Sequence, residues 1–183
     1  MSFTFVNIIG YGYMGSAICH LCKNNNVHFC TYGGNEKRAI MNSDNLDKLV
    51  EYSELYNELN VYFICVDSQN VETILEQLYD KVKSNCNTVI IKTPINSGTT
   101  RKLSEKYSSK LEIFLCPEFL SEHNYKEGMY NQNFCLIGSS DQDNYTNACD
   151  IMRTIYKHKE INIICKTYEE CENGSSLSVQ NVM

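Results

Sequence analysis

Apolar positions along the chain alternate between two kinds of spacing, one typical of buried strands and the other typical of helices. Short continuous apolar runs predict strands at residues 3–9, 27–32, 61–66, 88–91, 111–115, 133–138 and 161–165. Helical spacing follows the first run and predicts later helices at residues 71–82, 99–107 and 145–156, with one or two more between residues 35 and 60. Strands that alternate with helices are typical of a parallel sheet with crossover helices. We therefore predict an α/β fold with a doubly wound, mostly parallel sheet and helices on both faces.

The length and charge of the chain exclude several classes of protein. With 183 residues, of which 43% are hydrophobic and 21% charged, the chain suits one globular domain with a full core. A net charge of −6 argues against a nucleic-acid surface, which needs basic side chains against the phosphates. No apolar stretch approaches the roughly 18 residues of a membrane helix, and the first residues lack the basic segment of a signal peptide. We therefore expect a cytoplasmic protein without nucleic-acid or membrane partners.

The ten cysteines would suggest a disulfide framework in a small secreted protein, but no export signal precedes them. Most lie in apolar runs, as Cys165 does, or face inward from a predicted helix, as Cys149 does, so we expect them to be buried and reduced. Cys19 and Cys22 have C-x-x-C spacing, but neither a second such pair nor two suitably spaced histidines complete four zinc ligands. We therefore predict core packing for these two thiols and no metal site.

Three glycines form the pattern G-x-G-x-x-G between the first predicted strand and the helix that follows it. In this context the first glycine permits a tight turn, the second lets the backbone approach a pyrophosphate, and the third lets the helix pack against the strand. The phosphates would lie at the helix N-terminus. The motif predicts a Rossmann-type cofactor site, although flavin proteins and some methyltransferases share it. We assign cofactor binding to its six residues, Gly10, Tyr11, Gly12, Tyr13, Met14 and Gly15.

The acid that contacts the adenosine ribose in NAD sites is missing from its usual place. That residue normally follows the second strand, where this chain has Y-G-G-N at residues 32–35. Glu36 lies slightly later and can reach back to the ribose, whereas Lys37 and Arg38 can attract the 2′-phosphate of NADP. These residues therefore leave NAD and NADP both open, with a weakened site as a third possibility.

Two later segments carry a family resemblance. They are IIKTPINSGTTRKL, residues 90–103, and CPEFLSEHNYKEGMYNQNFCLIG, residues 116–138. With the glycine motif, they resemble the UDP-glucose/GDP-mannose dehydrogenase family, whose members show a lysine, small hydroxyl residues and a proline before G-T-T, and then N-P-E-F-L-x-E-G. The resemblance covers roughly residues 3–172 and implies the N-terminal NAD-binding domain of that family.

Matching positions in the first of these segments carry family roles over to three residues. The resemblance implies that Lys92, Gly98 and Thr99 lie on the loop that family members place beside the nicotinamide and the substrate. It assigns Lys92 to the substrate, and Thr93 and Thr99 to the cofactor. The threonine that the family uses near the reacting centre aligns with Pro94, one place after Thr93.

The second segment supplies the candidate catalytic residue. The resemblance implies that Glu118 serves in base or water chemistry, that Phe119 and Leu120 join it at the substrate, and that Glu122 contacts the cofactor. Charge patterning alone would instead place Glu118 and Glu122 on a solvated face at the start of a helix. Cys116 lies beside Glu118, and a neighbouring carboxylate would raise the pKa of its thiol, so we expect no nucleophile there.

The resemblance also implies a reaction. The family oxidises the 6-hydroxyl of a UDP-sugar by two hydride transfers to NAD, with a cysteine nucleophile in a C-terminal half that this chain lacks. Residues 1–166 then form the dinucleotide-binding domain, and residues 167–183 begin the central helix of the family, where Thr167 and Glu170 have capping-box spacing. We expect these residues to need a complementary chain for catalysis. The alternative is a non-catalytic module that binds a dinucleotide or a protein partner.

Overall fold

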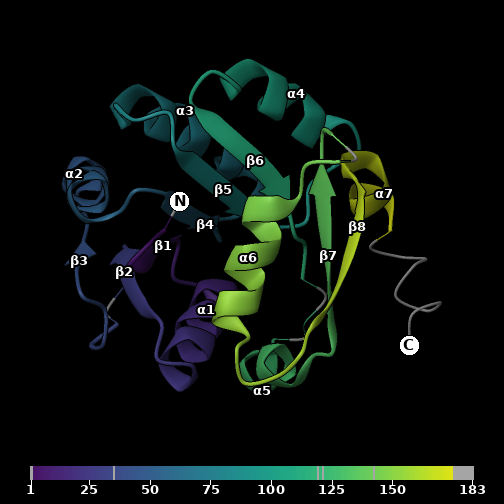
Figure 1. Cartoon of the computed structure of the whole chain (residues 1–183), viewed down its shortest axis with the longest axis horizontal. Helices are drawn as coiled ribbons and strands as arrows, with labels where there is room; N and C mark the ends of the chain where they lie inside the picture. The colour runs from purple at the N-terminus through teal and green to yellow at the C-terminus, as the bar shows by residue number, and fades with distance from the viewer. Residues whose placement is uncertain (1, 35, 119, 121, 142, 175–183) are drawn as a thin grey trace.

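The computed structural model describes residues 2–34, 36–118, 120, 122–141 and 143–174 (Figure 1). Within this part of the chain, eight strands form one sheet in the order β3-β2-β1-β4-β5-β6-β7-β8. The strands are β1 (Phe5–Ile9), β2 (His28–Tyr32), β3 (Asn42–Ser43), β4 (Asn60–Ile64), β5 (Asn87–Ile91), β6 (Leu111–Leu115), β7 (Phe134–Ser139) and β8 (Asn162–Thr167). The helices are α1 (Tyr13–Asn24), α2 (Leu46–Tyr56), α3 (Val71–Lys81), α4 (Thr99–Tyr107), α5 (Tyr125–Asn131), α6 (Thr146–Ile155), α7 (Tyr168–Asn173) and the 3₁₀ turn η1 (Ser68–Asn70).

The strand order reverses direction at β1. The chain moves outward from β1 to β2 and β3, and then returns to the other side of β1 to form β4, β5 and β6. All neighbouring strands are parallel except β6 and β7, which run antiparallel and pair at Leu115 and Gly138. A reversal of this kind opens a crevice at the carboxyl ends of β1 and β4, where ligands bind in doubly wound sheets. The structure therefore confirms the predicted fold class.

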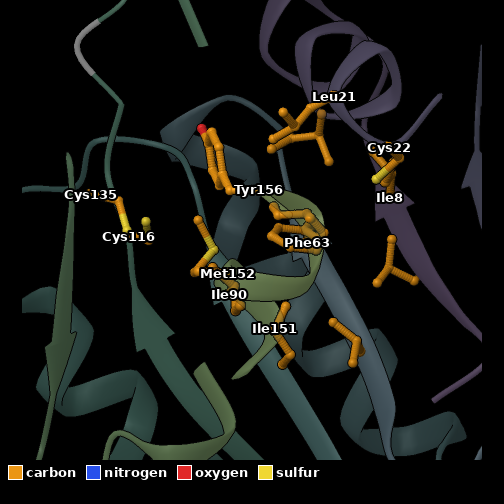
Figure 2. Close-up of a cluster of buried hydrophobic side chains, with 14 of the residues drawn as sticks. Ile8, Leu21, Cys22, Phe63, Ile90, Cys116, Cys135, Ile151, Met152 and Tyr156 are labelled. Carbon is orange, nitrogen blue, oxygen red and sulfur yellow. The ribbon is translucent and has the colours of Figure 1, made fainter. Parts of the chain in front are cut away.

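Helices cover both faces of the sheet because the central strands are apolar on both sides. In β4, Val61 and Phe63 face a core shared with α1, α5 and α6, whereas Tyr62 and Ile64 face a core shared with α2, α3, α4 and α7. Figure 2 shows the first of these cores, in which Ile151 and Met152 of α6 approach Phe63. Burial on both faces explains why the strands appear in the sequence as continuous apolar runs.

Some elements and burial patterns differ from the prediction. The prediction omitted β3, η1 and α5: β3 has only two residues, both polar, and α5 buries only Met129. On α6 the structure buries Ile151 and leaves Cys149 partly accessible. Cys165 is exposed because β8 is an edge strand, so the prediction that the cysteines are buried is wrong at this position.

Candidate functional site

The glycine turn between β1 and α1 is built by close backbone contacts. Gly10 has a φ of +98°, and a Cβ at this position would lie 2.6 Å from the carbonyl oxygen of Cys65. A Cβ on Gly15 would lie 2.0 Å from the carbonyl oxygen of Gly10. Only glycine avoids these two clashes. The first and third positions of the motif are therefore required by the fold itself.

Gly12 differs from the other two glycines because nothing in the described structure restricts it. A Cβ there would meet no atom within 4 Å, and the φ of −87° is one that any residue adopts. Gly12 is the N-cap of α1, whose first turn carries no acidic side chain. The fold therefore does not require glycine here, but the close approach of a pyrophosphate to the helix N-terminus would.

A cavity of about 450 Å³ opens beside the N-terminus of α1. It lies where β1, β4 and β5 end, so it occupies the crevice created by the reversal of strand order. Its lining residues are Gly12, Tyr13, Met14, Cys65, Val66, Asp67, Ser68, Gln69, Thr93 and Pro94. The hydroxyl of Thr93 donates a hydrogen bond to the carbonyl oxygen of Val66 over 2.5 Å, which fixes the two loops against each other. The structure thus brings four predicted cofactor residues around one cavity.

Glu36 reaches back to the glycine turn. Its carboxylate accepts a hydrogen bond from the Tyr11 hydroxyl at 2.9 Å and forms an ion pair with Lys23 of α1. Burial would raise the pKa of Glu36, but hydrogen bonds from Lys23, the Arg38 backbone N–H and Tyr11 together lower it. Glu36 is therefore a carboxylate at neutral pH, only 9% exposed, next to the glycine turn.

The unusual glycines after β2 are explained by the same contact. Gly33 and Gly34 both have a φ of +76°, a conformation that L side chains rarely adopt. A Cβ on Gly34 would also lie 2.3 Å from the ring of Tyr11. The two glycines let the chain turn under Tyr11 and bring Glu36 to its hydroxyl. Lys37 lies on the exposed side of this turn.

Lys92 and Glu118 form an ion pair inside the protein. Lys92 follows β5 and is fully buried, and its ammonium contacts the carboxylate of Glu118, which is 7% exposed. The same ammonium donates a hydrogen bond to the Cys116 sulfur at 3.2 Å. Burial would lower the pKa of Lys92, but the neighbouring Cys116 and Glu118 raise it above its usual value. The candidate catalytic carboxylate thus has a permanent cation beside it.

The pKa of the Cys116 thiol is shifted in the direction opposite to the one predicted from the sequence. A hydrogen bond from Cys135 lowers the pKa of Cys116, and the charge of Lys92 adds to this effect against burial and the charge of Glu118. The expected upward shift is therefore wrong, because the prediction considered only the carboxylate. Figure 2 shows Cys116 and Cys135 side by side in the core, and both are buried. Burial keeps them from acting as surface nucleophiles.

Three further predicted residues, Thr99, Leu120 and Glu122, do not line the cavity. Thr99 begins α4, and Glu122 is exposed in the turn that precedes α5. The structure therefore contradicts the alternative of a shared helix face, since Glu118 is buried and Glu122 is exposed. Leu120 packs against the core, and Phe119 lies outside the described residues.

The sequence did not predict that Glu172 contacts the N-terminus of α4. Its carboxylate accepts hydrogen bonds from the backbone N–H of Gly98 at 2.9 Å and of Thr100 at 3.0 Å, and from the Thr100 hydroxyl at 2.8 Å. It therefore caps the N-terminus of α4 from α7. The helix α7 begins with the expected capping box of Thr167 and Glu170. A separation of more than seventy residues leaves no local sequence signal for the contact between Glu172 and α4.

Membrane-spanning helices and metal-binding clusters are the last features to consider. In the residues that the structure describes, no helix is long and apolar enough to cross a membrane. Within the same residues, no three His, Cys, Asp or Glu side chains are grouped so that they could hold a metal ion. Cys19 and Cys22 are both buried in the core beneath α1, and burial raises the pKa of Cys19 to about 12.

The doubly wound sheet and its glycine turn define a Rossmann-type dinucleotide-binding domain. Comparison with family models then identifies the chain as a member of the UDP-glucose/GDP-mannose dehydrogenase family, because the model of the family's NAD-binding domain matches residues 35–160. The matched segment begins after the glycine turn, so the family match and the glycine geometry are separate observations. No curated protein matches the chain.

Solved structures confirm the fold. A GDP-mannose dehydrogenase from Pseudomonas aeruginosa, solved as a ternary complex, is 21% identical, with a TM-score of 0.71, and the match covers 97% of this chain and 49% of that one. For a UDP-glucose dehydrogenase from the archaeon Pyrobaculum islandicum, the identity is 15%, the TM-score 0.73 and the coverage 97% and 49%. A reductive aminase from Aspergillus terreus, solved with NADPH, is 10% identical, with a TM-score of 0.71 and coverage of 99% and 62%. The chain thus spans about half the length of the first two proteins.

Proposed function

We propose that this domain binds NAD, with the pyrophosphate at the glycine turn and the nicotinamide directed into the cavity beside Thr93. The observation that carries the proposal is Gly12. Its neighbours in the motif are held as glycines by protein contacts, whereas Gly12 faces open space at a helix N-terminus. A glycine that the fold does not need, at the place where a pyrophosphate would approach, supports a phosphate ligand.

Glu36 supports NAD in preference to NADP. Its carboxylate lies against the glycine turn through Tyr11 and stays charged, so it favours ribose hydroxyls and repels a 2′-phosphate. Lys37 and Arg38 are exposed beside it. We expect the Kd for NADPH to exceed that for NADH by about tenfold or more, which corresponds to about 1.4 kcal/mol.

The family suggests oxidation of the 6-hydroxyl of a UDP-sugar as the reaction of the complete enzyme. When bound, NAD supplies the hydride acceptor for this step. We assign acceptance of the hydroxyl proton to Glu118, and we assign Lys92 to holding that carboxylate in position through their ion pair. We propose that residues outside these 183 complete the substrate site, because the chain covers only 49% of the nucleotide-sugar dehydrogenases it matches.

A non-catalytic dinucleotide-binding module is the second candidate function. The observation that favours it is the Lys92–Glu118 contact itself, since this carboxylate is already occupied by a buried ammonium instead of facing the cofactor cavity. This candidate keeps the cofactor site and omits the reaction. Turnover by the domain combined with a complementary chain would exclude it.

Calorimetric titration of the 183-residue chain tests cofactor binding. NAD and NADH should bind, S-adenosylmethionine should not, and Gly12→Ala should weaken NADH binding by about tenfold or more. The same substitution should change the free energy of unfolding by no more than about 0.5 kcal/mol, since its Cβ meets no protein atom. Equal binding of NADH by Gly12→Ala and the unchanged chain would refute the proposed phosphate position. NAD with UDP-glucose should produce no NADH with this domain alone.

A further inference from the structure

Two cysteines meet at the edge of the sheet, away from the cofactor cavity. Cys165 lies on the edge strand β8 and is exposed, and Cys149 lies on α6 and is partly buried. Side chains alternate along a strand, so Cys165 shares a face with Ile163. Ile163 and Cys149 both pack against the core that α6 covers. The two thiols therefore face each other across the contact between α6 and β8.

A second contact fixes this approach. The hydroxyl of Tyr145, one helical turn before Cys149, donates a hydrogen bond to the carbonyl oxygen of Lys166, the residue after Cys165. This bond joins the start of α6 to the end of β8, close to both cysteines in the sequence. Cys165 lies close enough to Cys149 to raise the pKa of the Cys149 thiol. The hydrogen bond of Tyr145 and the packing of Cys149 and Ile163 against one core thus place the two cysteines side by side.

The pair is also accessible from solvent. A recess of about 240 Å³ opens beside Cys165, and its other lining residues are Tyr145, Lys166, Thr167 and Glu170. Cys116 and Cys135 also lie side by side, but both are buried in the core (Figure 2). Of these two pairs, one is therefore open to a reagent and the other is closed.

We propose that Cys149 and Cys165 form a reversible disulfide by exchange with a small disulfide such as oxidised glutathione. The Cys165 thiolate attacks one sulfur of the reagent and releases one glutathione thiolate, which leaves a mixed disulfide on Cys165. Cys149 then loses its proton and attacks the Cys165 sulfur, which releases the second glutathione. The two protein thiols lose two electrons and two protons, and the reagent is reduced to two molecules of glutathione.

The two cysteines have different roles in this exchange. Burial and the neighbouring Cys165 raise the pKa of Cys149 to about 11, so this thiol is a poor first nucleophile. Cys165 lies at the surface next to Lys166 and reaches the reagent first. Cys149 reacts only after the mixed disulfide has formed beside it. The bridge then ties α6 to β8 two residues before Thr167, which caps α7.

The test exposes the folded chain to oxidised glutathione, alkylates the remaining thiols, and identifies the products by intact mass and peptide mapping. The unchanged chain should lose two hydrogens and give a peptide that links Cys149 to Cys165. Cys149→Ser should stop at one glutathione per chain on Cys165. Cys165→Ser should give neither product on the same time scale.

Cys86→Ser is the matched control, because Cys86 is a partly buried cysteine outside both pairs. This variant should form the link at the rate of the unchanged chain. Cys116 and Cys135 should remain alkylatable after denaturation in every sample, which shows that the chain stayed folded during oxidation. The proposal would be overturned if the mixed disulfide accumulated in the unchanged chain. It would also be overturned if Cys149→Ser formed a disulfide between Cys165 and another cysteine as readily as the unchanged chain forms its link.

Discussion

Two turns at the carboxyl edge of the sheet begin helices in contrasting ways. The turn at residues 10–15, between β1 and α1, is held by backbone contacts, and Gly12 at the helix N-terminus faces open space. The turn at residues 92–100, between β5 and α4, is held by side chains from distant parts of the chain. Glu118 pairs with Lys92 at its start, and Glu172 accepts hydrogen bonds from the backbone of Gly98 and Thr100 at its end.

This difference shows which helix can receive an external anion. A helix N-terminus favours negative charge, because its first N–H groups lack partners within the helix. At α4 the protein supplies that charge itself through Glu172. At α1 the described residues place no carboxylate in the first turn. A phosphate is therefore expected at α1, and the second turn is expected to serve stability and positioning.

Removing the cation from the second turn should have the largest effect. Lys92→Met leaves the buried carboxylate of Glu118 without its partner, and this should lower the free energy of unfolding by about 3–5 kcal/mol. Urea unfolding followed by circular dichroism measures the change. The double variant Lys92→Met with Glu118→Gln removes both charges and should recover most of the loss. If the double variant is no more stable than the single one, the ion pair is not the cause.

The first turn should instead be sensitive to added volume. Gly15→Ala places a Cβ 2.0 Å from the Gly10 carbonyl oxygen, so α1 must move away from β1 at a cost of about 1–3 kcal/mol. Urea unfolding of this variant, with Gly12→Ala as the control in the same turn, measures that cost. A similar loss in both variants would contradict the distinction between a glycine that the fold needs and one that a ligand needs.

The cap on α4 should contribute less than either of these. Glu172→Ala leaves the backbone N–H groups of Gly98 and Thr100 without their acceptor, and stability should fall by about 1–2 kcal/mol. Thermal unfolding of this variant should be compared with that of Glu122→Ala, which changes an exposed glutamate and should have an effect within about 0.5 kcal/mol. Equal effects of the two changes would mean that the cap adds nothing measurable.

The same contrast explains how far the sequence predicts the molecule. The glycine turn was predictable because its geometry depends on residues within one short segment, and Glu36 lies close enough in the chain to be considered for the ribose. The second turn depends on contacts across 26 residues, for Lys92 with Glu118, and across more than seventy, for Glu172 with Gly98. Such contacts follow from strand order and packing, which spacing alone does not give.

The helices and strands likewise divide into those that the sequence predicts and those that it does not. Residues 99–107 and 111–115 were predicted with the bounds observed for α4 and β6, because their apolar side chains are buried. The strand β3 was missed because its two polar residues are held by pairing with β2 and not by burial. The division of the chain at residue 166 stays a prediction, since residues 175–183 lie outside the described structure.

The smallest expected effect is a pH dependence at the contact between α4 and α7. Glu169 accepts hydrogen bonds from the Arg101 guanidinium, which lowers the pKa of this carboxyl from 4.5 to about 2. In this interval the unfolded chain binds more protons than the folded one, so this contribution to stability is complete above pH 4.5 and is lost as the pH falls towards 2. Because both side chains are more than one third exposed, solvent screening keeps the effect small. Arg101→Gln should bring the pKa of Glu169, measured by NMR titration, close to 4.5 and flatten this part of the stability profile, whereas Lys102→Gln should leave both unchanged.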